Sequence, residues 1–191
     1  MDDVKNILIV GVGGQGALLA SKTLGQVLLD AGYDVKVSEV HGMSQRGGSV
    51  VTYVRYGKKV YSPIVDKGTA DFIVSFELLE AARYTQWLKK DGQIVVNTQK
   101  IDPMPVITGS AEYPADLESD MKNAGCKVDA LDCLSLAQKA GTAKAVNIVL
   151  MGRLSRYMDF PEEAWMNAIE KLVKPQFLEM NKTAFKLGRG E

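Results

Sequence analysis

The sequence predicts an α/β fold of Rossmann-like type: a mostly parallel sheet flanked by helices, with a hairpin at the edge and extra C-terminal helices. Apolar, β-branched runs alternate with segments of helical periodicity, and a glycine-rich loop separates the first run from the first helix. The composition, 46% hydrophobic and 24% charged, is ordinary for a globular chain. We expect the 191 residues to form one domain, with an α/β core over about 1–142 and a helical extension over about 143–191.

The first half of the chain is predicted to begin with a strand, a loop, a helix and a second strand. Ile7 to Val10 is a continuous apolar run, typical of a strand buried on both faces of a sheet. The helix carries leucine and valine at helical spacing and ends at Gly32, a residue suited to the end of a helix. The expected elements are strand 7–10, helix 17–31, strand 34–40, and a hairpin of strands 50–56 and 59–61.

The second half is predicted to continue with further strand and helix units, followed by helices alone. Glu77 and Glu80 fall at the start of a helix, where negative charge suits the helix dipole. Pro161 is expected at the first position of another helix, with two glutamates after it. The expected elements are strand 70–76, helix 77–88, strand 93–97, helix 115–124, strand 127–131, and helices 134–139, 145–158, 161–173 and 175–187.

Charge and residue counts exclude several functions. Lys+Arg and Asp+Glu are both 23, so no net field attracts nucleic acid or an anionic membrane. Cys126 and Cys133 are too few for an iron–sulfur cluster held by four thiolates, and a single histidine, His41, excludes a multi-histidine metal site. The first apolar run is too short for a membrane or secretory segment. We therefore expect a cytoplasmic protein with reduced cysteines packed in its core.

The loop after the first strand matches the G-x-G-x-x-G pattern through Gly11, Gly13, Gly14 and Gly16. Glycines at these positions let backbone N–H groups approach a phosphate at a helix N-terminus. Glu39 ends the second strand, where dinucleotide enzymes place an acid on the ribose. This interpretation predicts a nicotinamide-dependent or flavin-dependent oxidoreductase. Two alternatives remain open: the glycines serve only helix packing, or the loop faces a partner subunit or its cofactor.

A second glycine-rich loop follows the next strand and favours the partner interpretation. Its polar side chains, from Ser44, Gln45, Arg46 and Ser49, stand among Gly47 and Gly48, and Arg46 offers a bidentate fork for phosphate or carboxylate. Both loops are expected to leave the carboxyl ends of neighbouring strands and to share one polar crevice there. Gln15, in the first loop, occupies a position that is usually small or apolar in a dinucleotide site.

These paired loops resemble those of the gamma-type subunits of 2-oxoacid:ferredoxin oxidoreductases, and within that family the small subunits of the indolepyruvate enzymes. The resemblance rests on the stretches 10–16 and 43–50 with Glu39 between them. It continues through Ala70-Asp71, the strand that follows, residues 92–97 and Asn147, and covers most of the chain. The C-terminal helices are the least specific part of it.

The resemblance implies oxidative decarboxylation of a 2-oxoacid such as indolepyruvate, with coenzyme A as the acyl acceptor and ferredoxin as the electron acceptor. It also implies that thiamine diphosphate, magnesium and the iron–sulfur clusters lie on a large alpha-type partner subunit, and that the isolated chain is inactive. The positions carried over as cofactor-binding are Gly11, Gly13, Gly14, Gln15, Gly16, Ser44, Gln45, Arg46, Gly47 and Gly48, to which the dinucleotide motif adds Glu39.

Two other functions remain open at this point. One is the stand-alone dinucleotide-binding enzyme described above, and the other is a non-catalytic module for nucleotide sensing or assembly. His41 could act as an acid or base near neutral pH, but a lone histidine more often hydrogen-bonds to the backbone.

Overall fold

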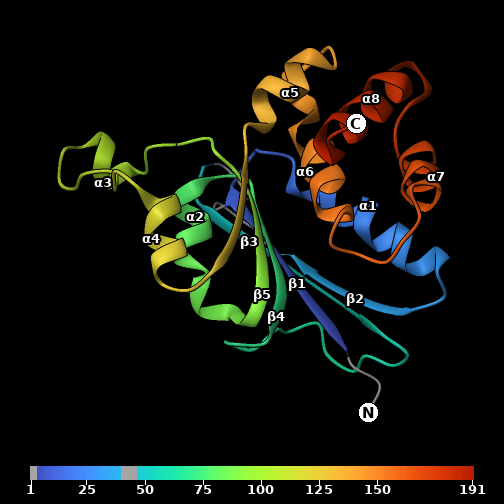
Figure 1. Cartoon of the computed structure of the whole chain (residues 1–191), viewed down its shortest axis with the longest axis horizontal. Helices are drawn as coiled ribbons and strands as arrows, with labels where there is room; N and C mark the ends of the chain where they lie inside the picture. Colours follow the sequence, from blue (N-terminus) through green and yellow to red (C-terminus); the bar gives the residue numbers. More distant parts are fainter. Residues whose placement is uncertain (1–3, 40–46) are drawn as a thin grey trace.

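The computed structural model describes residues 4–39 and 47–191, and it places one six-stranded sheet between two layers of helices (Figure 1). The strand order is β2-β3-β1-β4-β5-β6. β1, β4, β5 and β6 pair in parallel, whereas β3 runs antiparallel to both β1 and β2. The strands are β1 (Lys5–Val12), β2 (Asp34–Glu39), β3 (Ser49–Gly57), β4 (Ala70–Ser75), β5 (Leu88–Asn97) and β6 (Lys127–Leu131). The predicted α/β fold with a mostly parallel sheet is confirmed.

Helices cover both faces of the sheet, but unequally (Figure 1). The larger layer contains α1 (Ala17–Asp30), α5 (Cys133–Lys139), α6 (Val146–Ser155), α7 (Glu162–Leu172) and α8 (Leu178–Arg189). The smaller layer contains α2 (Leu78–Arg83) and α4 (Leu117–Asn123). A short helix, α3 (Met104–Ile107), and the 3₁₀ turns η2 (Thr85–Trp87), η3 (Ala143–Ala145) and η4 (Pro175–Phe177) complete the described elements.

The alternation of side chains along β1 produces two separate cores. Ile7 and Ile9 are fully buried against the larger helical layer, and Leu8 is equally buried in the core beneath α2 and α4. An uninterrupted apolar run is therefore what this strand requires, as the sequence indicated. Residues of α6, α7 and α8 share their core with α1 and the sheet. The single-domain organisation stays a prediction.

The antiparallel edge is present, but its hairpin differs from the predicted one. β3 pairs with β2 on one side and with β1 on the other, and residues 59–61 are not a strand. Both edges of β3 are already paired, with β1 and with β2, so residues 59–61 cannot pair with it as a second hairpin strand. Instead, the N–H of Val60 donates to Oδ2 of Asp34 at 2.9 Å. This hydrogen bond gives the N–H of Val60 the partner that strand pairing would otherwise have provided, and the Val60 side chain is buried.

The helix predicted over 77–88 is also too long, since α2 ends at Arg83 and β5 already begins at Leu88. A β-bulge makes the longer strand possible. Asp91 adopts a φ of 67°, and the pairing register of β4 with β5 shifts between Ala70 and Phe72. The Asp91-Gly92 pair therefore lies inside a strand rather than in front of one.

A bidentate ion pair fixes α6 to the edge strand β6. Arg153 donates from Nε and Nη2 to the two oxygens of Asp129 at 2.6 and 2.8 Å, and Tyr157 donates to the same carboxylate at 2.5 Å. Burial alone would raise the pKa of Asp129, but the hydrogen bonds from Arg153 and Tyr157 outweigh it and hold the pKa below its usual value. The pair therefore stabilises the folded state when Asp129 is ionised.

Replacing Arg153 by methionine should lower the free energy of unfolding at pH 7 by about 2 kcal/mol, because a partly buried carboxylate loses its cation. A lowered folded-state pKa contributes stability above the unfolded pKa of about 3.9, and this contribution is lost as the pH falls through the folded value. Urea unfolding should therefore show the difference between wild type and variant shrinking below about pH 4. Lys122→Met, at an exposed pair with Glu118, is the matched control and should change stability by less than about 1 kcal/mol.

Candidate functional site

The first glycine loop turns the chain from β1 into α1 at the carboxyl edge of the sheet. Gly16 is the N-cap of α1 with a φ of 90°, and a Cβ at this position would lie 2.9 Å from Nδ2 of Asn147 on α6. A Cβ at Gly11 would lie 2.9 Å from the Cβ of Phe76. Glycine is therefore required at both positions by backbone conformation or close packing.

Gln15 binds to the chain itself rather than extending into solvent. Its Oε1 accepts from the N–H of Val12 at 2.7 Å, and its Nε2 donates to the carbonyl of Phe76 at 3.2 Å and to Oε1 of Gln99 at 3.4 Å. The side chain thus connects the loop after β1 to the chain beyond β4 and β5. Contact of Gln15 with a cofactor stays a prediction, whereas its positioning of the loop follows from these bonds.

Replacing Gln15 by methionine should lower the free energy of unfolding by about 2 kcal/mol, because the N–H of Val12 loses its acceptor in a half-buried site. Gln15→Glu is the control, since a carboxylate still accepts from Val12 but cannot donate to Phe76. It should retain part of the lost stability. Thermal unfolding of the three proteins measures the effect, and equal stability of Gln15→Met and wild type would contradict this positioning role.

The first glycine loop contacts the described end of the second, and the polar crevice that the two loops are expected to share stays a prediction. The N–H of Gly13 donates to the carbonyl of Gly48 at 2.9 Å, next to the start of β3 at Ser49. The strands that carry the loops are not neighbours, however, because β3 lies between β1 and β2. The remaining predicted residues of the second loop, Ser44, Gln45 and Arg46, lie outside the described residues, as does His41.

A hollow of about 320 Å³ opens beside the first loop. It is lined by Gly13, Gly14, Gly16, Ala17, Leu18, Glu39, Val50, Val51 and Thr52. The N-terminus of α1 has no side-chain cap and no acid in its first turn, so its N–H groups keep their positive potential. A Cβ at Gly14 would meet nothing within 4 Å. The backbone of this loop can therefore be approached by an anionic group such as a phosphate.

Glu39 borders the same hollow, but its position differs from that of a ribose-binding acid. Its Oε1 accepts from Oγ of Ser21 on α1 at 2.8 Å. In a dinucleotide-binding fold the acid ends the parallel strand next to β1. Here the strand next to β1 is antiparallel, so Glu39 ends a strand one position farther away. This order weakens the nicotinamide interpretation.

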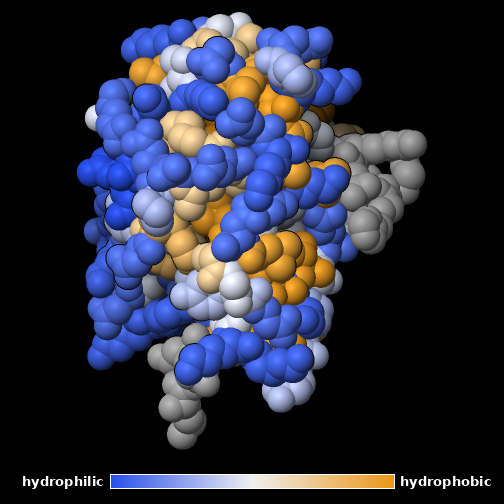
Figure 2. Space-filling model, turned by 90° about the vertical axis from the view of Figure 1, so that its right-hand side faces the viewer, coloured by the Kyte–Doolittle hydropathy of each residue, from blue (hydrophilic) through white to orange (hydrophobic). Residues whose placement is uncertain are grey.

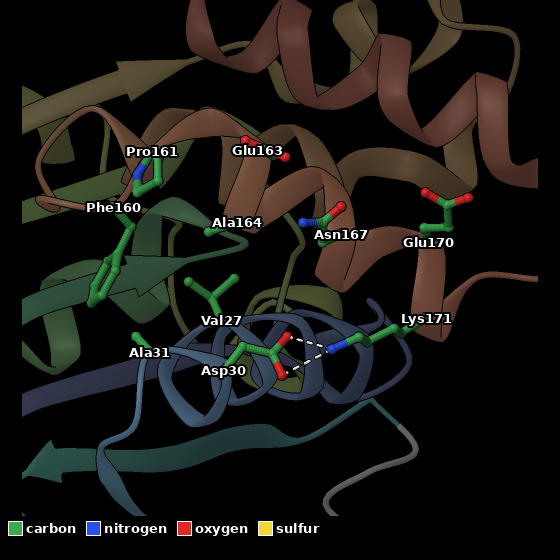
Figure 3. Close-up of a pocket in the computed structure, with 10 residues that line it drawn as sticks. All are labelled: Val27, Asp30, Ala31, Phe160, Pro161, Glu163, Ala164, Asn167, Glu170 and Lys171. Carbon is green, nitrogen blue, oxygen red and sulfur yellow. Dashed lines mark hydrogen bonds and ion pairs between the residues drawn. The ribbon is translucent and has the colours of Figure 1, made fainter.

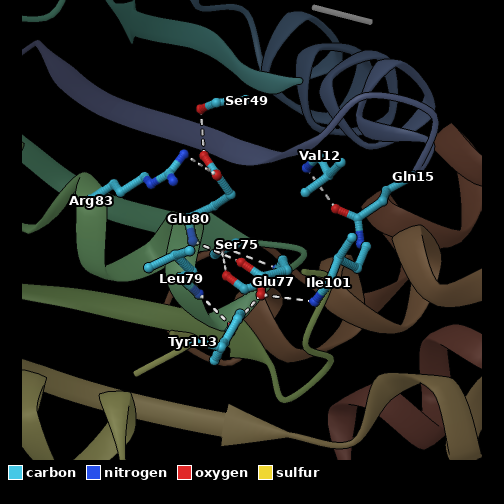
Figure 4. A network of polar contacts seen from close by, with 10 residues as sticks. All are labelled: Val12, Gln15, Ser49, Ser75, Glu77, Leu79, Glu80, Arg83, Ile101 and Tyr113. Carbon is cyan, nitrogen blue, oxygen red and sulfur yellow. Dashed lines mark hydrogen bonds and ion pairs between the residues drawn. The ribbon is translucent and has the colours of Figure 1, made fainter. Parts of the chain in front are cut away.

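A buried network of hydrogen bonds around Glu77 and Glu80 lies where α2 begins, next to the start of β3 (Figure 4). Glu77 caps α2 by accepting from the N–H of Glu80 at 2.8 Å, and its other oxygen accepts from the N–H of Ile101 at 3.1 Å and from the Tyr113 hydroxyl. Glu80 accepts from Ser49 and, at 3.0 Å, from Arg83. Both glutamates are almost fully buried.

The electrostatics of this network follow from its burial. Burial raises the pKa of Glu80, and the Ser49 hydrogen bond and the Arg83 charge oppose that rise only in part. Burial and the Glu77 carboxylate both raise the pKa of the Tyr113 hydroxyl. The network ties the start of β3, where the second loop ends, to α2 and to the chain beyond β5.

Asn97 and Gln99 are parts of the site that sequence reasoning did not single out. Asn97 is fully buried and donates to the carbonyl of Phe76 at 3.1 Å and to Oε1 of Gln99 at 3.3 Å. With Gln15 they form a chain of amides across the ends of β1, β4 and β5. An asparagine directly after the apolar run 94–96 was the available signal, because a buried amide needs partners.

A larger hollow, about 750 Å³, lies between α1 and α7 and is far from these loops (Figure 3). It surrounds the ion pair of Asp30 and Lys171, whose closest atoms are 2.8 Å apart. Asp30 ends α1, so the hollow lies about 20 Å along the helix from Gly16. Its size alone does not connect it to the candidate site.

The two cysteines behave as the sequence predicted. Both are free thiols: Cys133 is fully buried, and Cys126 is partly buried against the core beneath α2 and α4. Burial raises the pKa of both thiols, which keeps them protonated and unreactive at neutral pH. Among residues 4–39 and 47–191, no group of three or more His, Cys, Asp or Glu side chains is arranged to hold a metal ion.

The family model of pyruvate ferredoxin/flavodoxin oxidoreductase matches residues 6–191. The chain belongs to this family. Indolepyruvate oxidoreductase subunit IorB of Thermococcus kodakarensis is 46% identical over 188 residues, which are 96% of this chain and 93% of that protein. The subunit of the same name from Archaeoglobus fulgidus is 38% identical over 96% of this chain and 92% of its own length. The predicted resemblance to gamma-type subunits is confirmed.

Two solved structures share the fold of this chain. Pyruvate oxidoreductase subunit PORC of Thermotoga maritima superposes with a TM-score of 0.73 at 24% identity, covering 98% of this chain and 96% of that one. A 2-oxoglutarate:ferredoxin oxidoreductase chain from Magnetococcus marinus superposes with a TM-score of 0.74 at 19% identity. This chain matches only 31% of it, so the same fold also occurs as one part of a longer polypeptide.

Within the described part of the chain, no helix combines the length and the apolar character needed to cross a bilayer.

Proposed function

We propose that this chain is the small subunit of a ferredoxin-dependent indolepyruvate oxidoreductase. The complex would convert an aryl 2-oxoacid and coenzyme A into the aryl-acetyl-CoA and carbon dioxide, passing two electrons to ferredoxin. The observation that carries the proposal is the 46% identity to an indolepyruvate oxidoreductase subunit over nearly the full length of both chains. Three further relatives of that name support it.

The residues of this chain favour a division of labour with a larger alpha-type subunit. With 2 cysteines and 1 histidine, it cannot supply the usual four thiolates of an iron–sulfur cluster. We therefore assign thiamine diphosphate, magnesium and the clusters to the larger subunit, which would also pass electrons to ferredoxin. At the hollow beside the first loop, the N–H groups of the uncapped α1 N-terminus are the part that fits an anionic group contributed by coenzyme A or by a cofactor that the partner holds, since the Glu39 carboxylate on the same lining repels one.

An exposed apolar face next to the loops supports docking on such a partner. On α1 and the edge strand β2, Leu18, Leu29 and Val37 are 50%, 56% and 42% exposed. Figure 2 shows apolar residues grouped on this side of the molecule, at the level of α1 and β2. Leu18 also borders the hollow at the first loop. Grouped apolar side chains at a surface mark interaction sites more often than isolated ones do.

Reconstitution tests the proposed function. The chain is co-expressed with the larger subunit, which we expect to carry thiamine and ferredoxin-like cysteine motifs, and reduction of ferredoxin by indolepyruvate is measured with and without coenzyme A. We expect a stable complex whose activity needs both subunits. Full activity of the larger subunit alone would contradict the proposal. Tight binding of NAD by this chain without a partner would instead favour the dinucleotide interpretation.

Arg46 of the second loop should matter for the complex but not for the fold. Arg46→Ala is expected to lower the activity of the reconstituted complex or its assembly, since the bidentate contact with a phosphate or carboxylate is lost. Arg46→Lys keeps the charge without the fork and should recover only part of the loss. Circular dichroism checks folding, and an unchanged rate with unchanged assembly would refute a functional role for Arg46.

A further inference from the structure

A second cleft lies on the other side of the first glycine loop, among the C-terminal helices. It measures about 450 Å³ and is lined by Leu19, Thr142, Lys144, Ala145, Asn147, Leu172, Val173, Lys174, Phe177, Met180 and Asn181. Asn147 links it to the loop, because its Nδ2 donates to the carbonyl of Gly16 at 3.3 Å. In Figure 1, the helices that form it lie on the same face of the sheet as α1.

The size and the lining of this cleft suit a small organic ligand. Pockets for such ligands typically measure 300–1,000 Å³ and have a mostly apolar lining with a few placed polar groups. The lining here combines aliphatic side chains with Met180, whose thioether packs well on an aromatic ring. Phe177 stands beside it with 44% of its surface exposed, so an aromatic ring is available for stacking.

The charges around the cleft are all of one sign. Among the described residues, the charged ones that line it are Lys144 and Lys174, which are both exposed, and none that lines it is acidic. Neither lysine forms an ion pair with any residue of the described ranges. The hollow between α1 and α7, by contrast, contains Asp30 and two glutamates. In a chain of net charge +0, two lysines without an ion-pair partner among the described residues, beside a largely apolar lining, favour an anionic ligand.

The uncharged polar groups of the cleft also leave donors for an anion. The hydroxyl oxygen of Thr142 accepts from the backbone N–H of Lys144 at 3.3 Å, which leaves its own hydrogen free to donate. Asn181 donates to the carbonyl of Phe177 at 2.8 Å and thereby fixes the start of α8 beside the cleft. The Thr142 hydroxyl is thus a donor in the same cleft as the two exposed lysines, whereas the amides of Asn147 and Asn181 are buried.

We propose that this cleft binds an aryl monocarboxylate, with the ring against Val173, Phe177 and Met180 and the carboxylate between Lys144 and Lys174. The cleft itself predicts this chemistry. The natural source rests on the proposed function: either the aryl 2-oxoacid that the complex consumes or the arylacetate formed by hydrolysis of its thioester product. Both share the ring and the carboxylate, so the test must separate them.

Calorimetric titration of the full chain without a partner tests the proposal. The probes are phenylpyruvate for the 2-oxoacid and indole-3-acetate for the arylacetate, with indole and acetate as controls that lack one half of the ligand. We expect saturable binding of at least one full probe and at least tenfold weaker binding of indole and acetate. The tighter of the two full probes identifies the source. Absence of saturable binding by both would overturn the proposal, as would equal binding of indole.

Two lysine pairs provide matched variants. Lys144→Ala with Lys174→Ala should weaken probe binding at least tenfold, while Lys22→Ala with Lys90→Ala, at exposed positions outside the cleft, should not change it. Circular dichroism confirms folding of both. Equal affinity of the two double variants would overturn the site. Because binding is measured on the chain alone, failure of the reconstituted activity would count against the proposed function and leave this result intact.

The alternative occupant of the cleft is a segment of the larger subunit, and loss of assembly in the lysine double variant would identify it. If Lys144→Ala with Lys174→Ala no longer co-purifies with the larger subunit and neither probe binds to the wild-type chain, the cleft is a protein docking surface and the ligand proposal is wrong.

Discussion

Replacing Gly152 by alanine is expected to lower the free energy of unfolding by at least about 3 kcal/mol, the upper end of what overpacking usually costs. Gly152 lies in α6 where that helix crosses α8, and a Cβ there would be 2.1 Å from the carbonyl oxygen of Phe185. Gly188 of α8 faces α6 in the same way, with a Cβ only 2.0 Å from the carbonyl oxygen of Val149. At both positions the added Cβ would overlap the backbone of the other helix, so the two helices would have to separate.

Chemical denaturation measures this effect, and Gly25→Ala provides the control. Gly25 is also a buried glycine within a helix, α1, but a Cβ there would meet nothing within 4 Å. Alanine should therefore stabilise this position by up to about 1 kcal/mol through helix propensity. Because Gly152→Ala and Gly188→Ala push the same helices apart, their combined effect should be less than the sum of the single effects. Wild-type stability of Gly152→Ala would contradict the close crossing.

Helical glycines show what the sequence could and could not predict. An isolated glycine in a helical pattern weakens the helix and indicates a packing reason, so Gly25 and Gly152 looked alike, and Gly188 fell just past the helix predicted over 175–187. Only the arrangement of the helices separates the two that are needed for close approach from the one that is not. Helix and strand type followed from local periodicity, whereas the crossing of α6 and α8 depends on contacts between distant segments.

The sheet shows the same division between local and distant information. β1 and the loop after it were predictable, because a buried strand, glycines and a helix start are encoded within a few residues. The place of β3 between β1 and β2 was not, since the alternation of apolar residues does not say which strands pair. The same limit applies to the candidate site, because its contacts depend on which strands pair. Both loops were identified, but the bond from Gly13 to Gly48 and the internal bonds of Gln15 depend on that strand order.

Asn97→Ala is expected to lower the free energy of unfolding by about 3 kcal/mol, because it removes the central member of the amide chain at the carboxyl edge. Besides its bonds to Phe76 and Gln99, Asn97 accepts from the N–H of Cys133 at 3.1 Å, at the start of α5. That buried N–H would be left without a partner. Asn167→Ala, on the exposed face of α7, is the matched control and should change stability by less than about 0.5 kcal/mol.

Asn97→Asp separates the donor role of this side chain from its acceptor role. The introduced carboxyl can still accept from Cys133, but when ionised it places negative charge against the carbonyl of Phe76 and Oε1 of Gln99. Burial and these oxygens should raise its folded pKa above the unfolded value of about 3.9, so the variant should be most stable in acid and lose stability as the pH rises through the folded pKa. Since Gln99 also contacts Gln15, hydrogen exchange at the N–H of Val12 should quicken in both Asn97 variants at neutral pH. Unchanged exchange there would mean that the amide chain does not support the first glycine loop.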